Sequence, residues 1–164
     1  MATQAKQNGG IYFDDLRVGD QYQTPGRTVT ETDVVNFAGL SADYNSLHVD
    51  AEFAKGLDFG QRVAHGLLIM SMASGLTSRL PFIVQMGPAI QGLLDLNCQW
   101  PKPTFLGDTI HVVVSITDKK VTSKGTSGIV TMSRDAVNQR GETVMKSVGK
   151  FLIKRDVLRG AADV

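Results

Sequence analysis

The sequence predicts an α+β fold in which one antiparallel sheet wraps around a single apolar helix. Two observations lead to this fold class. Residues 66–76 form a nearly uninterrupted apolar run of helical length, and from residue 89 onward the chain consists of long runs typical of β-strands. Because short breaks separate most of these runs, the strands are expected to pair antiparallel. A sheet that curls around the helix would bury both elements.

The first third of the chain contains one amphipathic helix. Extended chain over residues 21–29 is interrupted at Pro25-Gly26, a dipeptide typical of turns. Thr30 and Asp33 match a capping box at the start of a helix that we expect to end near Ser41. The apolar side chains of this helix recur at helical spacing; they are Val34, Val35, Phe37, Ala38 and Leu40.

Two further helical segments are expected. Asp50 can cap a single turn that stops before Gly56, and a flexible connection follows over residues 57–62. The run from Gly66 to Leu76 is apolar on nearly every side, which indicates a helix surrounded by the rest of the fold or by a partner subunit. Pro81 lies just beyond its expected end.

The second half of the chain predicts four consecutive strands joined by short turns. They cover residues 89–100, 109–117, 128–137 and 143–153. The last two breaks contain the glycine and polar residues that hairpin connections favour. Such a sheet leaves an edge and an outer face that need cover, so we expect a homodimer with a continuous sheet.

Length, charge and cysteine content limit the classes of function. A chain of 164 residues with 42% apolar residues is expected to form one domain over 11–155, between tails at 1–10 and 156–164 of which the first reads as disordered. A net charge of +1 without basic runs argues against nucleic acid or a membrane surface as a partner. The apolar run is also shorter than the roughly 20 residues of a membrane span. The single cysteine, Cys98, lies among leucines and is expected to be a buried strand thiol in a reducing cytoplasm.

The candidate site is a polar loop between the two main helices. Asp43, Asn45 and His48 lie within six residues of one another, and His65-Gly66 stands at the start of the apolar helix. A carboxylate and an imidazole together can move protons near neutral pH. A glycine at a helix N-terminus leaves unpaired N–H groups accessible to developing negative charge. We expect His65 to cap the helix or orient the loop, outside the catalytic pair.

Three separated motifs carry a family resemblance. They are FAGLSADYNSLH at residues 37–48, AHGLL at residues 64–68 and PTFLGD at residues 103–108. In this order they resemble the MaoC-like, (R)-specific enoyl-CoA hydratase group of hot-dog-fold proteins, and the resemblance covers roughly residues 12–153. The family loop usually has a glycine and a proline where this chain has Ala42 and Ser46.

The resemblance implies a hydro-lyase that converts a trans-2-enoyl-CoA to an (R)-3-hydroxyacyl-CoA, or the reverse. It implies no cofactor beyond the coenzyme A of the substrate, and no metal. By position, Asp43 and His48 match the catalytic pair, and Asn45 matches the asparagine that arranges it. Gly66 matches the glycine whose N–H binds the thioester oxygen, and Ser74 matches the serine that the family places in the site from the central helix.

Other interpretations of these residues stay open. Asp43 could bond only to turn amides, and His48 could be an ordinary surface histidine. Metal binding by this pair is disfavoured because the sequence offers no third ligand of evident kind. A hot-dog acyl-CoA thioesterase is one alternative. A non-catalytic acyl-CoA or acyl-carrier binding protein is another, since Ala42 and Ser46 change the loop.

Overall fold

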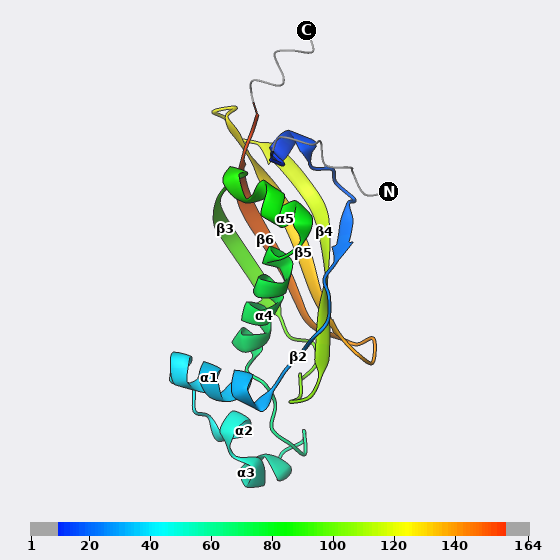
Figure 1. Ribbon diagram of the computed structural model, residues 1–164. Coiled ribbons are helices and arrows are strands. Elements are labelled where there is room, and N and C mark those ends of the chain that lie inside the picture. Colours follow the sequence, from blue (N-terminus) through cyan, green and yellow to red (C-terminus); the bar gives the residue numbers. More distant parts are fainter. Residues whose placement is uncertain (1–9, 157–164) are drawn as a thin grey trace.

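A computed structural model describes residues 10–156 of the chain. The expected tails lie outside the described residues, apart from Gly10 and Asp156. The α+β class is confirmed, because one long helix, α4, lies along one face of an antiparallel sheet (Figure 1). The shorter helices α1, α2 and α3 gather at one end of the sheet (Figure 1).

The helical elements of residues 10–156 include the three predicted helices, as α1, α3 and α4, and four short elements that the sequence does not predict. They are η1 (Phe13–Asp15), α1 (Glu31–Ser41), α2 (Ser46–Val49), α3 (Ala51–Lys55), α4 (Gly66–Ser78), α5 (Pro81–Met86) and η2 (Gly87–Ala89). Both predicted caps are confirmed: Thr30 and Asp33 form a capping box at α1, and the Asp50 side chain accepts the amide of Phe53 at the start of α3. Local sequence is therefore sufficient to begin these helices.

The strands form one sheet in which every pairing is antiparallel. They are β1 (Gln21–Gln23), β2 (Arg27–Thr28), β3 (Ile90–Gln99), β4 (Thr109–Val121), β5 (Ser127–Asn138) and β6 (Thr143–Lys154). The order is β1-β4-β5-β6-β3, and β2 also pairs with β4. The two predicted hairpins are confirmed. The strands do not follow one another as a simple series, however, because β3 pairs with β6 rather than with β4.

The core lies between α4 and the sheet. Alternate side chains of β4 and β5 are buried toward the helix, as expected for strands with one face in the core. The side of α4 that meets them buries Leu68, Ile69, Met72, Ala73, Leu76 and Thr77. Within residues 10–156 no single helix has the length and apolar character needed to cross a membrane. Helix α4 and segment Pro81–Ala89 meet those criteria only together, with a bend of 76° between them.

One side of α4 and the neighbouring edge strand β3 remain open in the single chain. Leu67, Ser71 and Ser74 are exposed on α4, so the rest of the fold does not enclose the helix, and of the two predicted kinds of cover only a partner subunit is left for this side. The prediction of a buried thiol is also wrong in degree, because Cys98 is half-buried and the leucines near it are exposed. The strand is correct, but its position at the sheet edge removes the cover that burial needs.

Candidate active site

Local hydrogen bonds shape the segment that follows α1. Helix α1 is capped by Ala42, whose φ of 59° is the only positive value of a non-glycine residue within residues 10–156. The Ser41 hydroxyl accepts the amide of Asp43 at 3.2 Å, and Asp43 Oδ1 accepts the amide of Asn45 at 3.3 Å. Asp43 is exposed, and no described residue bonds its second carboxylate oxygen. That oxygen is available to a ligand.

His48 lies in a short helix rather than in the predicted loop. The side chain of Asn45 accepts the amide of Leu47 at 3.1 Å and so caps α2, which contains His48. His48 Nδ1 is 2.8 Å from the carbonyl oxygen of Val63. Because a carbonyl only accepts, this contact assigns the proton to Nδ1 and leaves the lone pair on Nε2. His48 is thereby oriented as a proton acceptor.

His65 orients the polar loop, which is the second of its two expected roles, and it makes no side-chain cap at α4. Its Nε2 is 3.0 Å from the carbonyl oxygen of Asp43, so it donates a hydrogen bond to the backbone of that residue. Its ring stacks on His48, with centroids 3.8 Å apart, and also contacts Phe37. His65 is 2% exposed, and its Nδ1 is buried without a hydrogen-bond partner among residues 10–156.

Asp43, His48 and His65 form a compact triad of possible ligands. One donor atom from each lies within 4.8 Å of the others. The argument that a third metal ligand is missing is therefore wrong, because His65 supplies one from 17 residues further along the chain than His48. Each histidine already commits one nitrogen to a backbone carbonyl. The same three groups can also hold and move a proton without a metal.

Gly66 begins α4 beside an aromatic ring. The Trp100 indole Nε1–H donates to the carbonyl oxygen of Gly66 at 2.8 Å. A Cβ at Gly66 would lie 3.0 Å from the Trp100 ring, so the ring would have to shift to accept a side chain there. His65 makes no side-chain capping bond, and no described residue accepts the Gly66 N–H. The N–H groups at this helix start are available to an anionic or partly negative atom.

A cavity of about 380 Å³ connects His48 with this helix start. Its wall comes from α2, the start of α4 and the loop after β3; the lining residues include His48, Gly66, Ile69, Trp100, Lys102 and Thr104. The lining is mostly apolar, as in sites for small organic ligands. The third sequence motif therefore forms part of the cavity wall.

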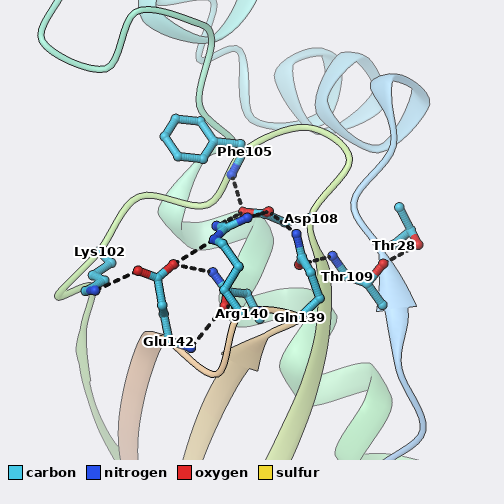
Figure 2. Close-up of polar contacts among 9 residues, drawn as sticks. Thr28, Lys102, Phe105, Asp108, Thr109, Gln139, Arg140 and Glu142 are labelled. Atoms are coloured by element: carbon cyan, nitrogen blue, oxygen red, sulfur yellow. Dashed lines mark hydrogen bonds and ion pairs between the residues drawn. The ribbon is translucent and has the colours of Figure 1, made fainter.

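Asp108 anchors the loop that forms this wall. Figure 2 shows its carboxylate accepting hydrogen bonds from Arg140 at 2.7 and 3.2 Å, from Gln139 at 2.8 Å and from the Phe105 amide at 2.9 Å. Burial tends to raise the pKa of Asp108, but these hydrogen bonds outweigh it and hold the pKa below its usual value. The carboxylate is therefore ionised at neutral pH and holds the loop to the β5–β6 hairpin.

Glu142 extends the same network to Lys102 (Figure 2). It accepts hydrogen bonds from Asn138 at 2.9 Å, from Lys102 at 2.7 Å and from Arg140 at 2.9 Å. These three donors, in that order, lower the pKa of Glu142 to about 2. Lys102 is thus held at the cavity wall by a partner that is ionised at neutral pH. The members of the network lie on two segments, 102–108 and 138–142, and no local sequence pattern indicates that these segments meet.

The structure brings most of the predicted site residues together, but not all. Asp43, Asn45 and His48 form one local unit, and His48 and Gly66 line the same cavity. Ser74 lies on α4 about 12 Å along the helix axis from Gly66. It is exposed and does not line this cavity in the single chain. His65 has the loop-orienting role expected from its position directly before Gly66, and the structure adds its ring contact with His48.

Residues 15–138 match the sequence model of the family described as the MaoC like domain. The chain belongs to this family. The MaoC-like domain is 39% identical over 112 residues to Protein MaoC of Klebsiella aerogenes, an alignment that covers 67% of this chain and 32% of that protein. It is 36% identical over 109 residues to the (R)-specific enoyl-CoA hydratase of Rhodospirillum rubrum, covering 65% of this chain and 69% of the relative. The chain thus spans about a third of the first relative and over two thirds of the second.

Solved structures agree with the family match. The MaoC-like dehydratase from Rhodospirillum rubrum superposes with a TM-score of 0.79 at 30% identity, covering 89% of this chain and 98% of that chain. A Mycobacterium tuberculosis protein with a double hot-dog fold superposes with a TM-score of 0.76 at 18% identity, covering 90% of this chain and 45% of that chain. The second likeness concerns the fold alone, and it confirms the predicted hot-dog fold.

Proposed function

We propose that this MaoC-like domain is a hydro-lyase that adds water to a trans-2-enoyl-CoA to give an (R)-3-hydroxyacyl-CoA, or removes water in the reverse direction. The observation that carries the proposal is the pairing of Asp43 with His48, whose imidazole lines the cavity that Gly66 also lines. The family match and the hydratase among the relatives support the reaction class.

Proton transfer is the role that we assign to Asp43 and His48. In the hydration direction one O–H bond of water breaks, a C3–O bond and a C2–H bond form, and the C2=C3 π bond is lost. His48 Nε2 has the lone pair needed to accept one proton from water as the water oxygen bonds to C3, and it then delivers this proton to C2. The free Asp43 oxygen can orient the water by accepting a hydrogen bond from its other O–H, which stays in the 3-hydroxyl group of the product. A positioned acid or base group typically contributes about 10²–10⁴-fold to the rate.

Gly66 is assigned to the thioester oxygen. During addition, negative charge develops on this oxygen, and an N–H at a helix start stabilises such charge. The Gly66 N–H has no acceptor among the described residues, and glycine allows an acyl group to approach the backbone closely. This contact would also place C3 of the substrate on the side of the cavity where His48 lies.

Asn45 and Ser74 keep supporting roles in the proposal. Asn45 caps α2 and therefore fixes His48, which makes it a positioning residue in this chain. Ser74 would contact the far part of the acyl group rather than the reacting atoms, because it lies about 12 Å along α4 from Gly66. Its exposed position also allows contact with a partner subunit.

A homodimer is part of the proposal. Strand β3 is an unpaired edge with large exposed apolar side chains, and the open side of α4 lies next to it. Such edges pair with another chain unless they are blocked, and pairing of β3 with β3 of a second copy would continue the sheet. The pairing would also cover the side of α4 that carries Ser74.

The loss of enoyl-thioester absorbance with crotonyl-CoA is the test of this function. We expect the wild-type protein to remove the absorbance and Asp43→Asn to lower the rate by at least about 10²-fold with an unchanged melting temperature. A thiol-trapping reagent in parallel samples should detect no free coenzyme A. Release of thiol would indicate a thioesterase instead. Saturable binding of crotonyl-CoA without either signal would indicate a binding protein and would overturn the proposal.

A further inference from the structure

Arg134 is a buried cation without a counter-ion. It lies on β5, is 4% exposed and points to the same side of the strand as Met132 and Ala136, which belong to the core beneath α4. Its Nε and Nη2 atoms are buried without a hydrogen-bond partner, and no described carboxylate forms an ion pair with it. An uncompensated buried charge is strongly destabilising, so such a group is expected to meet an anion in the working protein.

The contacts of Arg134 provide no negative charge. Its guanidinium lies 5.6 Å from the centroid of the Phe151 ring, and Nη2 lies beside Gly149, where a Cβ would be in ordinary van der Waals contact at 3.5 Å. Cys98 is a titratable neighbour. Burial raises the pKa of the Cys98 thiol despite the nearby guanidinium, so the thiol is uncharged at neutral pH and cannot neutralise the cation.

Arg134 lies below the part of α4 that begins at the proposed thioester site. Gly66, Met70 and Ser74 are four residues apart and form one stripe of the helix. Met70 Sδ is 3.9 Å from Cys98 Sγ, and Cys98 and Arg134 are both paired with Ser147 of β6. Met70 is only about 6 Å along the helix axis from Gly66. A short acyl group that leaves Gly66 along this stripe would therefore approach the guanidinium.

We propose that Arg134 binds a carboxylate at the distal end of the acyl group, so that the substrates are CoA monothioesters of short dicarboxylic acids. The inference rests on the proposed function, since it uses Gly66 as the site of the thioester oxygen. A planar guanidinium suits a carboxylate because it can donate two parallel hydrogen bonds. The free Nε and Nη2 atoms are the pair that this geometry uses.

Matched substrates test the inference directly. Crotonyl-CoA and fumaryl-CoA differ only in the terminal group, which is a methyl in the first and a carboxylate in the second. 2-Pentenoyl-CoA and glutaconyl-CoA form the same comparison with a chain one carbon longer. We expect kcat/KM for the carboxylated member of at least one pair to exceed that of its uncharged partner by about tenfold or more.

Two variants separate the charge of Arg134 from general effects. Arg134→Met should abolish the preference for the carboxylated substrate, and Arg134→Lys should retain part of it. Arg134→Met is expected to keep or raise the melting temperature, because it removes an uncompensated buried charge. Lys146→Met is the matched control, since it removes a charge of the same sign from the exposed side of β6 and should not change the preference.

Binding of saturated analogues makes the test independent of turnover. Succinyl-CoA should bind more tightly than butyryl-CoA by titration calorimetry, and Arg134→Lys should reduce the difference even if Arg134→Met does not fold. Hydration of crotonyl-CoA without preference for either carboxylated substrate would overturn this inference and leave the proposed function intact. Selective binding of succinyl-CoA without any hydration would support this inference and overturn the proposed function. A lower melting temperature in Arg134→Met with an unchanged preference would assign Arg134 to folding or to the dimer and would overturn the inference.

Discussion

The imidazole rings of His48 and His65 stack with their centroids 3.8 Å apart and 28° between their planes. Each ring also donates a hydrogen bond to a backbone carbonyl. His48 donates to Val63, and His65 donates to Asp43. His65 therefore contacts both members of the predicted pair. It stacks on the ring of His48, and it donates a hydrogen bond to the backbone carbonyl of Asp43. It is a positioning residue whose loss should disturb Asp43 and His48 together.

Replacement of His65 by phenylalanine tests this role. The ring contact with His48 is retained, but the hydrogen bond to the Asp43 carbonyl is lost, so the carboxylate should move relative to His48. We expect kcat for crotonyl-CoA hydration to fall by about tenfold or more while KM changes less. His111→Phe is the control, because His111 lies on β4 and does not line the cavity. Full activity of His65→Phe would remove His65 from the site.

Gly66→Ala should displace the indole of Trp100. The added Cβ would lie 3.0 Å from the ring, and the hydrogen bond from Nε1 to the Gly66 carbonyl would be strained. Because Trp100 is the only tryptophan, a shift of intrinsic fluorescence would report its movement. We expect kcat/KM to fall by at least about tenfold as the N–H donor moves. Gly75→Ala on the same helix meets no atom within 4 Å and should change neither signal.

Ala42→Gly should stabilise the protein. Ala42 has a φ of 59°, which is unfavourable for a residue with a Cβ and is not unfavourable for glycine. Glycine also has the greater conformational entropy in the unfolded chain, and this offsets part of the gain. We expect the free energy of unfolding to rise by up to about 1 kcal/mol. Urea denaturation would measure it. Ala51→Gly, at a helical position in α3, should lower stability instead, and the same sign for both variants would contradict the argument.

The stabilising effect of Asp108 should depend on pH. The pKa of Asp108 is lower in the folded protein than in the unfolded chain. Its contribution to the free energy of unfolding is therefore complete above the unfolded pKa of about 4, and it is lost as the pH falls through the folded pKa. Asp108→Asn should therefore be less stable by about 1–3 kcal/mol at pH 7, and the difference should shrink below about pH 4. Melting temperatures from pH 7 to pH 3 measure this, with Asp118→Asn as the control for loss of one charge. A stability difference between wild type and Asp108→Asn that grows as the pH falls would contradict this prediction.

The proposed dimer predicts a particle of about twice the 17.7 kDa of one chain by light scattering. Leu94→Lys places a charge among the exposed leucines of β3 and should shift the protein toward the monomer. Val121→Lys changes an exposed apolar residue at the end of β4, far along the sheet from this edge, and should leave the mass unchanged. A wild-type monomer at micromolar concentration would contradict the proposal.

Most of the fold could be predicted because its signals are local. The apolar run beginning at Gly66, the capping pair of Thr30 and Asp33, and the two hairpin breaks each depend on residues close together in the chain. The neighbour of β3 could not be predicted in this way. Its pairing with β6 joins segments that are far apart in the chain, and no short motif encodes that choice.

The candidate site divides in the same manner. Asp43, Asn45 and His48 can be predicted from the sequence because they are close together and carry groups suited to proton transfer. Arg134 cannot, because a single arginine in a strand with alternating burial gives no sign that its guanidinium is enclosed without a partner. The sequence shows Asp108 only as part of a motif, and its four hydrogen bonds depend on distant segments as well.

Neighbouring side chains and their spacing are enough to predict helices α1, α3 and α4, the long strands, the polar segment and the family resemblance, but not helices α2 and α5. The stacking of His65 on His48, the packing of Trp100 on Gly66 and the pairing of Arg140 with Asp108 depend on the tertiary structure. These contacts join distant segments, and their geometry is set by how the core packs and how the strands are registered. The charge and shape of the site depend on both.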